Sequence, residues 1–558
     1  MISKVRKYYN LHPLRFILLV GLFFRLLASF FSRGYAFTDD HFFVMEEAFQ
    51  WMQSGDFLNP SSYDPLRLAH GSLYTLIHFG FLNITQGIPP NLQMFLIRLL
   101  HAVYSLLLVK WVFQWAKQKY GFKLAIHSAW IISIFFLFPY LSVRNLVEFV
   151  SIPPLFWGMW KLNSNQDIKP ITLMLIGLMF SIAFGLRFQT ILVSGTAGIM
   201  FLLLNPLRKS LLVFIGFLFG FTIINVALEI WVWGEPLHEL IEYVSYNSKN
   251  SHLYPNGPWY QYIFLLLGIG LLPFGPLIFF GFLKSLRIDW KWSIPILVFI
   301  VFHSLYPNKQ ERFIFTILPL FLVIGWAEFL MSSNKFLQKF QTKKWQKAFW
   351  LTNLILIFPL VFTSTKPGKM DVMLTLYKNG DANKILVENS QRQGREYFPL
   401  FYWGKKGKID HITQELSTSD YFDSIRILKR QPPEYVVFLD TNNWAERKNN
   451  FKELGIGLSD SIRIYDSWID HLISGINPII KKNIWTIFRL YYKAYLPASA
   501  SAATIETTTT TEASKAITAA PKTTSSSAMA AAKSTEEKGR VINSPSSNST
   551  STASAEKY

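Results

Sequence analysis

Long apolar runs separated by short basic clusters constrain this chain more than any other feature. A membrane-spanning helix needs about 20 predominantly apolar residues, and about eleven segments approach or exceed that length. Over 558 residues, a hydrophobic content of 51% is typical of a protein whose solvent is partly lipid. The predicted spans are 14–32, 93–116, 123–141, 145–161, 171–187, 188–205, 210–231, 259–283, 292–306, 313–331 and 346–364.

The basic clusters alternate with long or chemically richer connections. If the N-terminus lies inside, the inside connections are 117–123, 161–169, 208–209, 284–291 and 335–347, and each contains lysine or arginine. This agrees with the rule that cytoplasmic loops are positive. The outside connections include 33–92, 232–258 and 307–312. Because the formal charge of +20 follows membrane topology, we expect no nucleic-acid partner.

The first outside connection, 33–92, contains two further helical patterns. Leu73 to Ile84 is apolar but short, and counting it as a span would break the charge alternation, so we expect a re-entrant or interfacial helix. Phe42 to Met52 is amphipathic, and we expect it to lie on the membrane surface.

The odd number of spans places the rest of the chain outside, beyond a transmembrane domain of residues 1–365. Residues 366–496 predict a small soluble α/β domain, with a buried strand at Tyr435–Leu439 and a helix end near Lys429. Its last part, 471–496, is amphipathic and basic, a pattern that favours a return to the membrane surface. Residues 497–558 are rich in Ser, Thr and Ala and predict a disordered tail. The absence of cysteine excludes disulfides and thiolate sites.

Two adjacent carboxylates, Asp39 and Asp40, follow the first span directly. A carboxylate at this position is suited to act as general base toward an acceptor hydroxyl. The alternative is that Thr38 or Asp39 caps the helix that follows. Two adjacent carboxylates also suit Mg²⁺ or Mn²⁺, but the sequence leaves a cofactor undecided and we predict no metal ligands.

Lys309 and Arg312 lie in an outside loop, where the positive-inside rule disfavours cations. Both residue types neutralise phosphate, and arginine can bind it through two hydrogen bonds. The alternative is that they anchor the end of the next helix by extending toward the interface.

Aromatic and polar residues near the predicted outer face are further candidates. Tyr254, Trp259 and Tyr262 can form a stacking surface for a sugar or an interfacial aromatic belt. Arg187 and Glu229 lie at membrane depth, where charged groups line a cavity or pair with each other. Arg25 belongs to the same group, and Arg144 and Glu148, four residues apart, are expected to pair on one helix face.

Together these segments resemble the GT-C superfamily of polyprenol-dependent glycosyltransferases, and most of all the mannosyltransferases of glycosyltransferase family 22. The family's His-Pro-Asp-Glu motif corresponds to 37–40, and its His-Lys-Glu-x-Arg-Phe motif to 308–313. Its Tyr-Gly-x-x-Pro-Trp-x-x-Tyr stretch corresponds to 254–262, and its Arg-Ser-x-Leu-Tyr stretch survives at 71–74. The resemblance covers roughly residues 10–365. Departures at Phe37, Asn308 and Gln310 indicate a divergent, bacterial member.

The resemblance implies a multi-pass membrane hexosyltransferase, with mannose as the expected sugar. Its donor would be a polyprenyl-phosphate sugar and its acceptor a glycolipid or lipid-linked glycan. Asp39 or Asp40 would act as base, with Asp39 aligned to the family aspartate, and Lys309 and Arg312 would bind the donor phosphate. Tyr254, Trp259, Tyr262, Arg187 and Glu229 would contact substrate. Direct displacement by the acceptor hydroxyl would invert the anomeric centre.

Two alternatives stay open. One is a GT-C enzyme that uses another lipid-linked sugar, and the other is a transporter or flippase of lipid-linked glycans, which often shows repeat symmetry. The expected location is a bacterial inner membrane with the site facing the periplasm; the alternative is the lumenal face of the endoplasmic reticulum.

Overall fold

The computed structural model describes residues 2–54, 71–164, 167–251, 256–391, 395–459, 461–465, 467 and 484–492. The predicted tail, most of 471–496 and Tyr254 lie outside these residues. The N-terminal helices are α1 (Ile2–Leu11), α2 (Pro13–Phe31), α3 (Thr38–Asp40), η1 (His41–Glu46), α4 (Glu47–Ser54), α5 (Ser72–Ile84), α6 (Pro90–Tyr120), α7 (Phe122–Ile134), α8 (Phe138–Leu141), α9 (Val147–Val150), α10 (Ile152–Leu162), α11 (Pro170–Leu186), η2 (Phe188–Thr190), α12 (Ile191–Leu204), α13 (Leu207–Phe221), η3 (Thr222–Ala227), α14 (Leu228–Trp233) and α15 (His238–Asn250).

The second half of the chain adds more helices and all of the strands. The helices are α16 (Gln261–Ile269), α17 (Phe274–Ile288), α18 (Trp290–Leu305), η5 (Glu311–Thr316), α19 (Leu318–Leu330), α20 (Lys335–Gln338), α21 (Lys343–Val361), α22 (Pro367–Asn379), η6 (Leu400–Trp403), α23 (Thr418–Ile427) and α24 (Trp444–Glu453). The strands are β1 (Lys384–Glu388), β2 (Lys408–Ile412), β3 (Tyr435–Leu439), β4 (Ile456–Leu458), β5 (Ile462–Tyr465) and β6 (Ile484–Tyr492).

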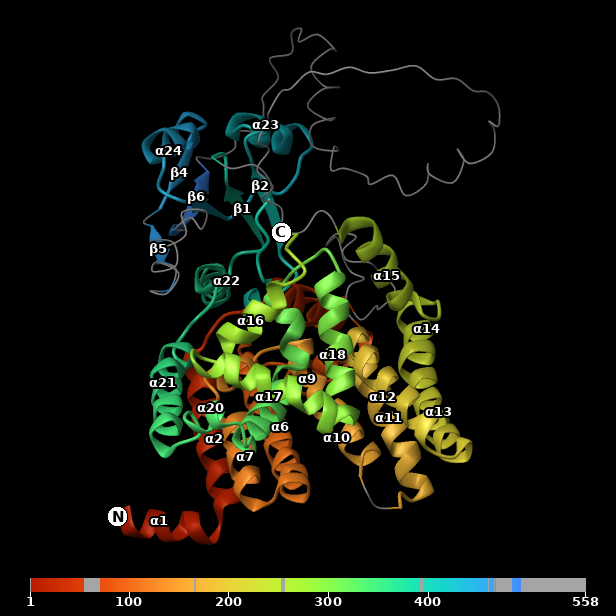
Figure 1. Ribbon diagram of the computed structural model, residues 1–558. Helices are drawn as coiled ribbons and strands as arrows, with labels where there is room; N and C mark the ends of the chain where they lie inside the picture. The colour runs from red at the N-terminus through yellow and green to blue at the C-terminus, as the bar shows by residue number, and fades with distance from the viewer. Residues whose placement is uncertain are drawn as a thin grey trace, which may run out of the picture. The chain divides into compact units, whose positions relative to one another are not determined.

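Each predicted span coincides with one or more apolar helices (Figure 1). In the described part of the chain, α2, α6 and the continuous stretch Leu207–Trp233 are long and apolar enough to cross a membrane alone. A fourth span is present if α16 and α17, which meet at 116°, count as one. Six shorter apolar helices, α5, α7, α11, Phe188–Leu204, α18 and α19, have 10–17 residues. The structure is that of a helical membrane protein, and the number of eleven spans stays a prediction.

Buried polar side chains satisfy the backbone at the end of helix α7. The predicted span 123–141 breaks after α7, which leaves backbone carbonyls at its end without helical partners. Arg25 donates to Ser133 O at 2.6 Å and to Ile132 O at 3.2 Å, and Asn353 donates to Ile134 O at 2.7 Å. Since unpaired backbone groups are costly away from water, Arg25 has a structural role.

Glycines allow two of the apolar helices to cross at close range. A methyl group added to Gly177 on α11 would collide with the backbone of α13, and one added to Gly216 on α13 would collide with the backbone of α11. Small residues at helix crossings are the usual way for membrane helices to gain van der Waals contact.

The connections that were predicted to lie outside gather at one end of the helical region. Four charged residues from different connections contact one another or shared neighbours there. They are Asp40 after α2, Arg144 before α9, Arg187 between α11 and α12, and Arg312 before α19. The ends of α10 and α12 and the starts of α13 and α18 line one cavity at the other end. These two groups of connections lie at different ends of the helices, and the predicted alternation across a membrane stays a prediction.

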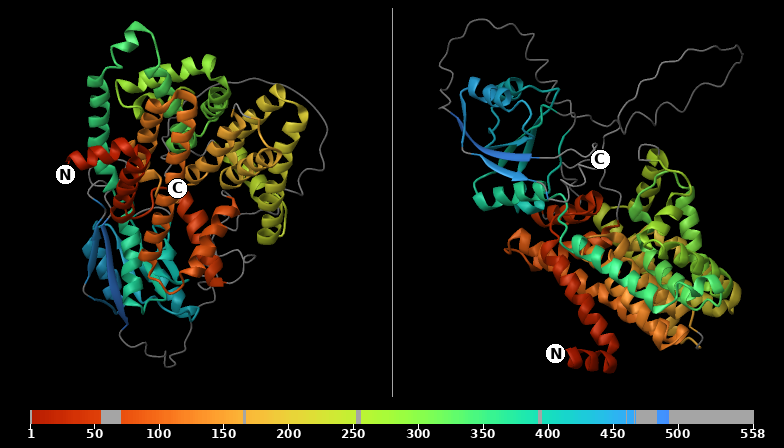
Figure 2. Two further views of the ribbon diagram at one scale, coloured as in Figure 1. Left: turned by 90° about the horizontal axis from the view of Figure 1, so that it is seen from below. Right: turned by 60° about the vertical axis from the view of Figure 1, so that its left-hand side comes forward.

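A mixed sheet forms the C-terminal part of the protein, with the strand order β2-β1-β3-β6-β4 and β5 also paired to β6. Strands β1, β2 and β3 are parallel, whereas β6 is antiparallel to β3, with Tyr435 opposite Arg489. All five residues of the predicted strand Tyr435–Leu439 are buried, because helix α22 contacts one face and α24 lies near the other (Figure 2). The predicted strand is confirmed.

Two expectations for segments that pack with this sheet are wrong. The first is Phe42 to Met52, which does not lie on a surface: Met45, Ala48 and Phe49 are buried in a shared core with α22 and the sheet. Its apolar face is covered by protein rather than lipid. The second is the end of the region 471–496, where residues 484–492 form the long strand β6 and pair on both sides.

Most of helix α23 belongs to a second unit, of which residues 419–430 are the described part. It ends at Ile427, close to the helix end predicted near Lys429. The boundaries predicted at 365 and 496 stay predictions.

Membrane orientation can be measured directly because the chain has no cysteine. Ser248 on α15 and Thr342 before α21 are both exposed and lie in connections predicted to face opposite sides. We expect Ser248→Cys to react with a membrane-impermeant maleimide in intact cells and Thr342→Cys to react only after permeabilisation. The reverse pattern would contradict the predicted orientation.

Candidate active site

The adjacent carboxylates Asp39 and Asp40 occupy very different environments. They lie on the single turn α3, which follows extended backbone at Phe37. Asp40 is fully buried, whereas the side chain of Asp39 is 41% exposed. The carboxylate of Asp39 is therefore the one that a dissolved or membrane-bound hydroxyl can reach.

Arg312 joins the two carboxylates. Its Nη1 donates to Asp40 Oδ2 at 2.9 Å, its Nη2 donates to Asp39 Oδ2, and its Nε donates to Gln310 Oε1 at 2.8 Å. The side chains of Arg312 and Asp40 are only 10% and 0% exposed. Charge-assisted bonds in such surroundings are strong and directional, so Arg312 fixes the position of both acids.

The second oxygen of Asp40 holds another segment. Asp40 Oδ1 accepts a hydrogen bond of 2.9 Å from the backbone N–H of Val147, the first residue of α9. No side chain caps the helix on which Asp39 and Asp40 themselves lie. Asp40 therefore does cap a helix, but that helix is α9, which lies 107 residues later in the chain.

Glu148 and Arg187 form the second ion pair of the site. Glu148 Oε1 lies 2.6 Å from Arg187 Nη1, and both side chains are buried. The expected pair of Arg144 with Glu148 is wrong, because the chain bends between these residues and α9 begins only at Val147. Arg144 instead donates to Gly34 O at 2.9 Å and to the hydroxyl of Ser32.

Arg187 retains donors that no protein group in the described residues accepts. Its Nε and Nη2 have no hydrogen-bond partner there, although only 6% of the residue is exposed. It occupies extended backbone at the turn between α11 and α12. Buried guanidinium donors without partners are rare, so Arg187 is arranged to receive an anionic or strongly polar group.

The five charged residues Asp39, Asp40, Glu148, Arg187 and Arg312 make up one ionic cluster. Burial raises the pKa of Asp40, against the opposing effects of Arg312 and the Val147 N–H. Burial alone would lower the pKa of Arg312, but Asp39, Glu148 and Asp40 together raise it above its ordinary value. Arg312 therefore stays charged beside the more exposed Asp39.

Lys309 points away from this cluster. Its ammonium donates to His303 O and Ser304 O, both at 2.9 Å, and to Tyr306 O. These carbonyls form the C-terminal end of α18, where a positive charge is favourable. In this structure Lys309 is buried and caps α18, the helix before the loop, rather than anchoring the next helix at an interface.

The predicted aromatic group separates into different roles. Tyr262 is buried, and its hydroxyl donates to Gln310 O at 3.0 Å and accepts from Gln310 N at 3.2 Å. It therefore positions the loop that carries Arg312. Trp259 is 62% exposed, and Tyr254 lies outside the described residues.

Glu229 contacts a residue that the sequence did not single out. Its Oε2 accepts from the backbone N–H of Glu239 at 3.0 Å. Glu239 in turn accepts from Ser72 N and from Trp233 Nε1, both at 2.7 Å. Glu229 and Glu239 thus join the two large predicted outer connections, and Glu239 takes the capping position at the start of α5.

The signal for Glu239 was weak in the sequence because an acidic residue at the start of a helix is ordinary. Burial, and then the neighbouring Glu229, raise the pKa of Glu239 to about 8.

No group of three or more His, Cys, Asp or Glu side chains that could hold a metal ion occurs in the described part of the chain.

Comparison with known proteins gives consistent relatives. A family model described as Alg9-like mannosyltransferase matches residues 16–386. GPI mannosyltransferase 3 of Candida glabrata is 22% identical over an alignment of 284 residues that covers 44% of this chain and 46% of that protein. The chain thus matches about half the length of this curated relative.

Solved structures show the same fold. ArnT from Cupriavidus metallidurans bound to undecaprenyl phosphate has a TM-score of 0.56 at 12% identity, covering 84% of this chain and 97% of that chain. The apo state of that protein has a TM-score of 0.51 at 12% identity, covering 85% and 96%. The helical region and the C-terminal sheet therefore form a GT-C-like fold.

The raised pKa of Glu239 predicts a pH-dependent stability. Because the pKa of Glu239 is about 8 in the folded state, the carboxyl keeps its proton up to about pH 8, whereas the unfolded carboxyl loses it near the ordinary pKa of 4.5. Stability is therefore highest below about pH 4.5 and declines as the pH rises through 8. We expect the Tm of the wild type to fall relative to that of Glu239→Gln over this window.

The neighbouring Glu235 provides the control for this measurement, because its side chain is 74% exposed. Glu235→Gln should follow the wild-type profile of Tm against pH. Parallel profiles for the wild type and Glu239→Gln would show that Glu239 does not titrate in this window.

Proposed function

The chain belongs to the Alg9-like mannosyltransferase family, and from this premise we propose that it transfers mannose from a polyprenyl-phosphate donor to a glycolipid or lipid-linked glycan with inversion. The family makes it a membrane glycosyltransferase. One observation carries the finer proposal. The exposed Asp39 lies beside the buried Asp40, and the buried Arg187 in the same cluster has two N–H groups without a partner in the described residues.

Asp39 acts as the general base. The acceptor O–H gives its proton to Asp39 while its oxygen attacks the anomeric carbon of the sugar. Arg312 holds the carboxylate of Asp39 by a hydrogen bond, and Asp40 keeps Arg312 in place. Asp40 therefore acts as a positioning residue. Because the hydroxyl displaces the phosphate directly, the anomeric configuration inverts.

The donor phosphate leaves with the electron pair of the broken C–O bond. Arg187 supports this step, since it can bind a phosphate oxygen without giving up a protein hydrogen bond. Arg312 would have to release a carboxylate to do the same, and Lys309 would have to release the end of α18. We therefore propose Arg187 as the first phosphate ligand, with Arg312 beside it.

The polyprenyl donor follows from the placement of the site. Nucleotide sugars are cytoplasmic, whereas the ionic cluster lies among connections predicted to face outward. A sugar on a lipid phosphate is a donor that reaches that face. ArnT, which shares the fold, was solved with undecaprenyl phosphate. We propose a bacterial inner membrane and a periplasmic active site, with the lumenal face of the endoplasmic reticulum as the alternative.

The test of the base is transfer of mannose by the purified protein, with polyprenyl-phosphate mannose as donor and a membrane glycolipid extract as acceptor. We expect Asp39→Asn to lower kcat by about 10²–10⁴-fold with little change in Tm, because Asp40 still pairs with Arg312. Asp40→Asn should lower both kcat and Tm, since it removes a buried partner of Arg312.

Asp381 provides a matched control, because it pairs with Arg489 and is 39% exposed, close to the exposure of Asp39. Asp381→Asn should keep full activity. Full activity in Asp39→Asn, Asp40→Asn and the double variant would rule out the proposed base.

The phosphate role of Arg187 predicts a selective effect on the donor. Arg187→Met should raise the KM for the donor by about 10–100-fold, the usual range for a charge-assisted hydrogen bond, and leave the KM for the acceptor unchanged. The variant also leaves Glu148 buried without its partner, which lowers the free energy of unfolding by about 3–5 kcal/mol.

A second variant separates these effects. Glu148→Gln combined with Arg187→Met removes both charges, so its Tm should return toward that of the wild type. Its donor KM should stay high. A donor KM that recovers together with Tm would show that Arg187 has only a structural role.

A further inference from the structure

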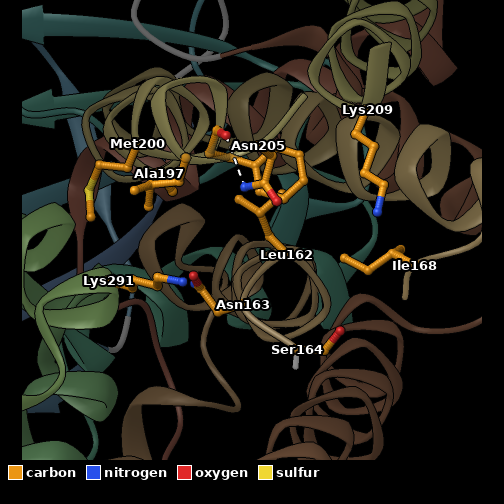
Figure 3. A pocket seen from close by; sticks show the side chains of 11 residues that line it. Leu162, Asn163, Ser164, Ile168, Ala197, Met200, Asn205, Lys209 and Lys291 are labelled. Atoms are coloured by element: carbon orange, nitrogen blue, oxygen red, sulfur yellow. Dashed lines mark hydrogen bonds between the residues drawn. The ribbon is translucent and has the colours of Figure 1, made fainter. Parts of the chain in front are cut away.

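A cavity with a polar rim lies at the end of the helices opposite the ionic cluster. It is lined by the ends of α10 and α12, the starts of α13 and α18, and Ile168 in the connection after α10 (Figure 3). Two of these helices begin near the cluster, since Glu148 precedes α10 and Arg187 precedes α12. With 14 residues in α12 and about 1.5 Å of rise per residue, the cavity is about 20 Å away from the proposed active site.

The cavity combines an apolar floor with two cationic side chains. Met200, Phe201 and Leu204 contribute apolar surface from α12. Lys291 reaches in beside the carboxamide of Asn163, and Lys209 lies at the other side (Figure 3). The volume is ≈ 90 Å³, whereas a single water needs about 10–15 Å³. The site therefore accommodates a group several times larger than water.

The lysines are available to bind an anion. Lys209 pairs with Asp167 at 2.6 Å, but the side chain of Asp167 is 89% exposed, and exposed pairs contribute only about 0–1 kcal/mol. A phosphate can replace this carboxylate at small cost. Lys291 makes no recorded ion pair with any described residue and is exposed. Asn163, Ser164 and Asn205 add uncharged polar groups around the rim.

The surface around the cavity is apolar and open. Leu203 is 78% exposed, Leu207 63% and Ile171 61%, and these residues lie on the same helices or beside them. Large side chains exposed on apolar helices face lipid. A molecule with its charge between the lysines would therefore have hydrocarbon surface next to it, which suits a lipid and gives no advantage to a free phosphate ion.

We propose that this cavity binds the phosphate headgroup of an anionic membrane phospholipid, with Lys209 and Lys291 as the charged ligands. The polar rim holds the headgroup, and the acyl chains lie against Leu203 and Leu207. Basic pockets between membrane helices are suited to anionic headgroups. This lipid is distinct from the donor, because it binds at the opposite end of the helices, and the inference does not depend on the proposed reaction.

The test is lipid binding to the detergent-purified full chain by native mass spectrometry, with phosphatidylglycerol and phosphatidylcholine as probes. We expect the wild type to bind phosphatidylglycerol at least about 10-fold more tightly than Lys209→Gln/Lys291→Gln, since two charge-assisted contacts are lost. Lys343→Gln/Lys344→Gln is the control, because it removes two exposed lysines at the start of α21, outside the cavity. Because all four lysines are near the surface, each variant should keep the Tm of the wild type.

Each other outcome overturns the proposal. Equal loss of binding in the control variant would mean a diffuse attraction between basic loops and anionic lipid. Unchanged binding in Lys209→Gln/Lys291→Gln would exclude the cavity. Equal affinity for phosphatidylcholine would show that charge is not recognised, and full displacement by inorganic phosphate would assign the site to a free anion.

Discussion

The buried ionic cluster is the constraint on which the outer end of this protein depends. Three carboxylates and two guanidinium groups from four separate connections meet there, and Arg312 lies 272 residues from Asp40 in sequence. Removing one partner from such a group leaves an uncompensated buried charge, at a cost of about 3–5 kcal/mol. The helices that supply these residues must therefore keep their relative positions, and the short interruptions at α9, η2 and η5 are what turn the side chains inward.

The sequence predicted the helices and the acidic and basic motifs because these depend on local patterns. Apolar runs of membrane length and the alternation of lysines mark the helices, and the resemblance to a family connected Asp39 with Arg312. The sequence also predicted the buried strand at Tyr435–Leu439, whose apolar residues are continuous. These features need no knowledge of which segments meet.

What could not be predicted depends on long-range contacts. Spacing placed Glu148 with Arg144, but the partner is Arg187, because the chain bends before α9 and a helical spacing of four does not apply. Phe42 to Met52 has the pattern of a surface helix, and only the fold shows that protein covers its apolar face. Lys309 was assigned to phosphate from its type and location, yet the nearest acceptors are the carbonyls that end α18.

The contacts between the first outer connection and the end of the chain determine when the enzyme can become active during synthesis. The backbone N–H of Phe401 donates to both carboxylate oxygens of Glu46, 355 residues earlier, at 3.0 Å each, and the ring of His41, next to Asp40, stacks on Tyr402. The acidic turn leaves the ribosome long before these partners exist. A nascent chain therefore carries its acidic residues on a turn that lacks this support until η6 has been synthesised.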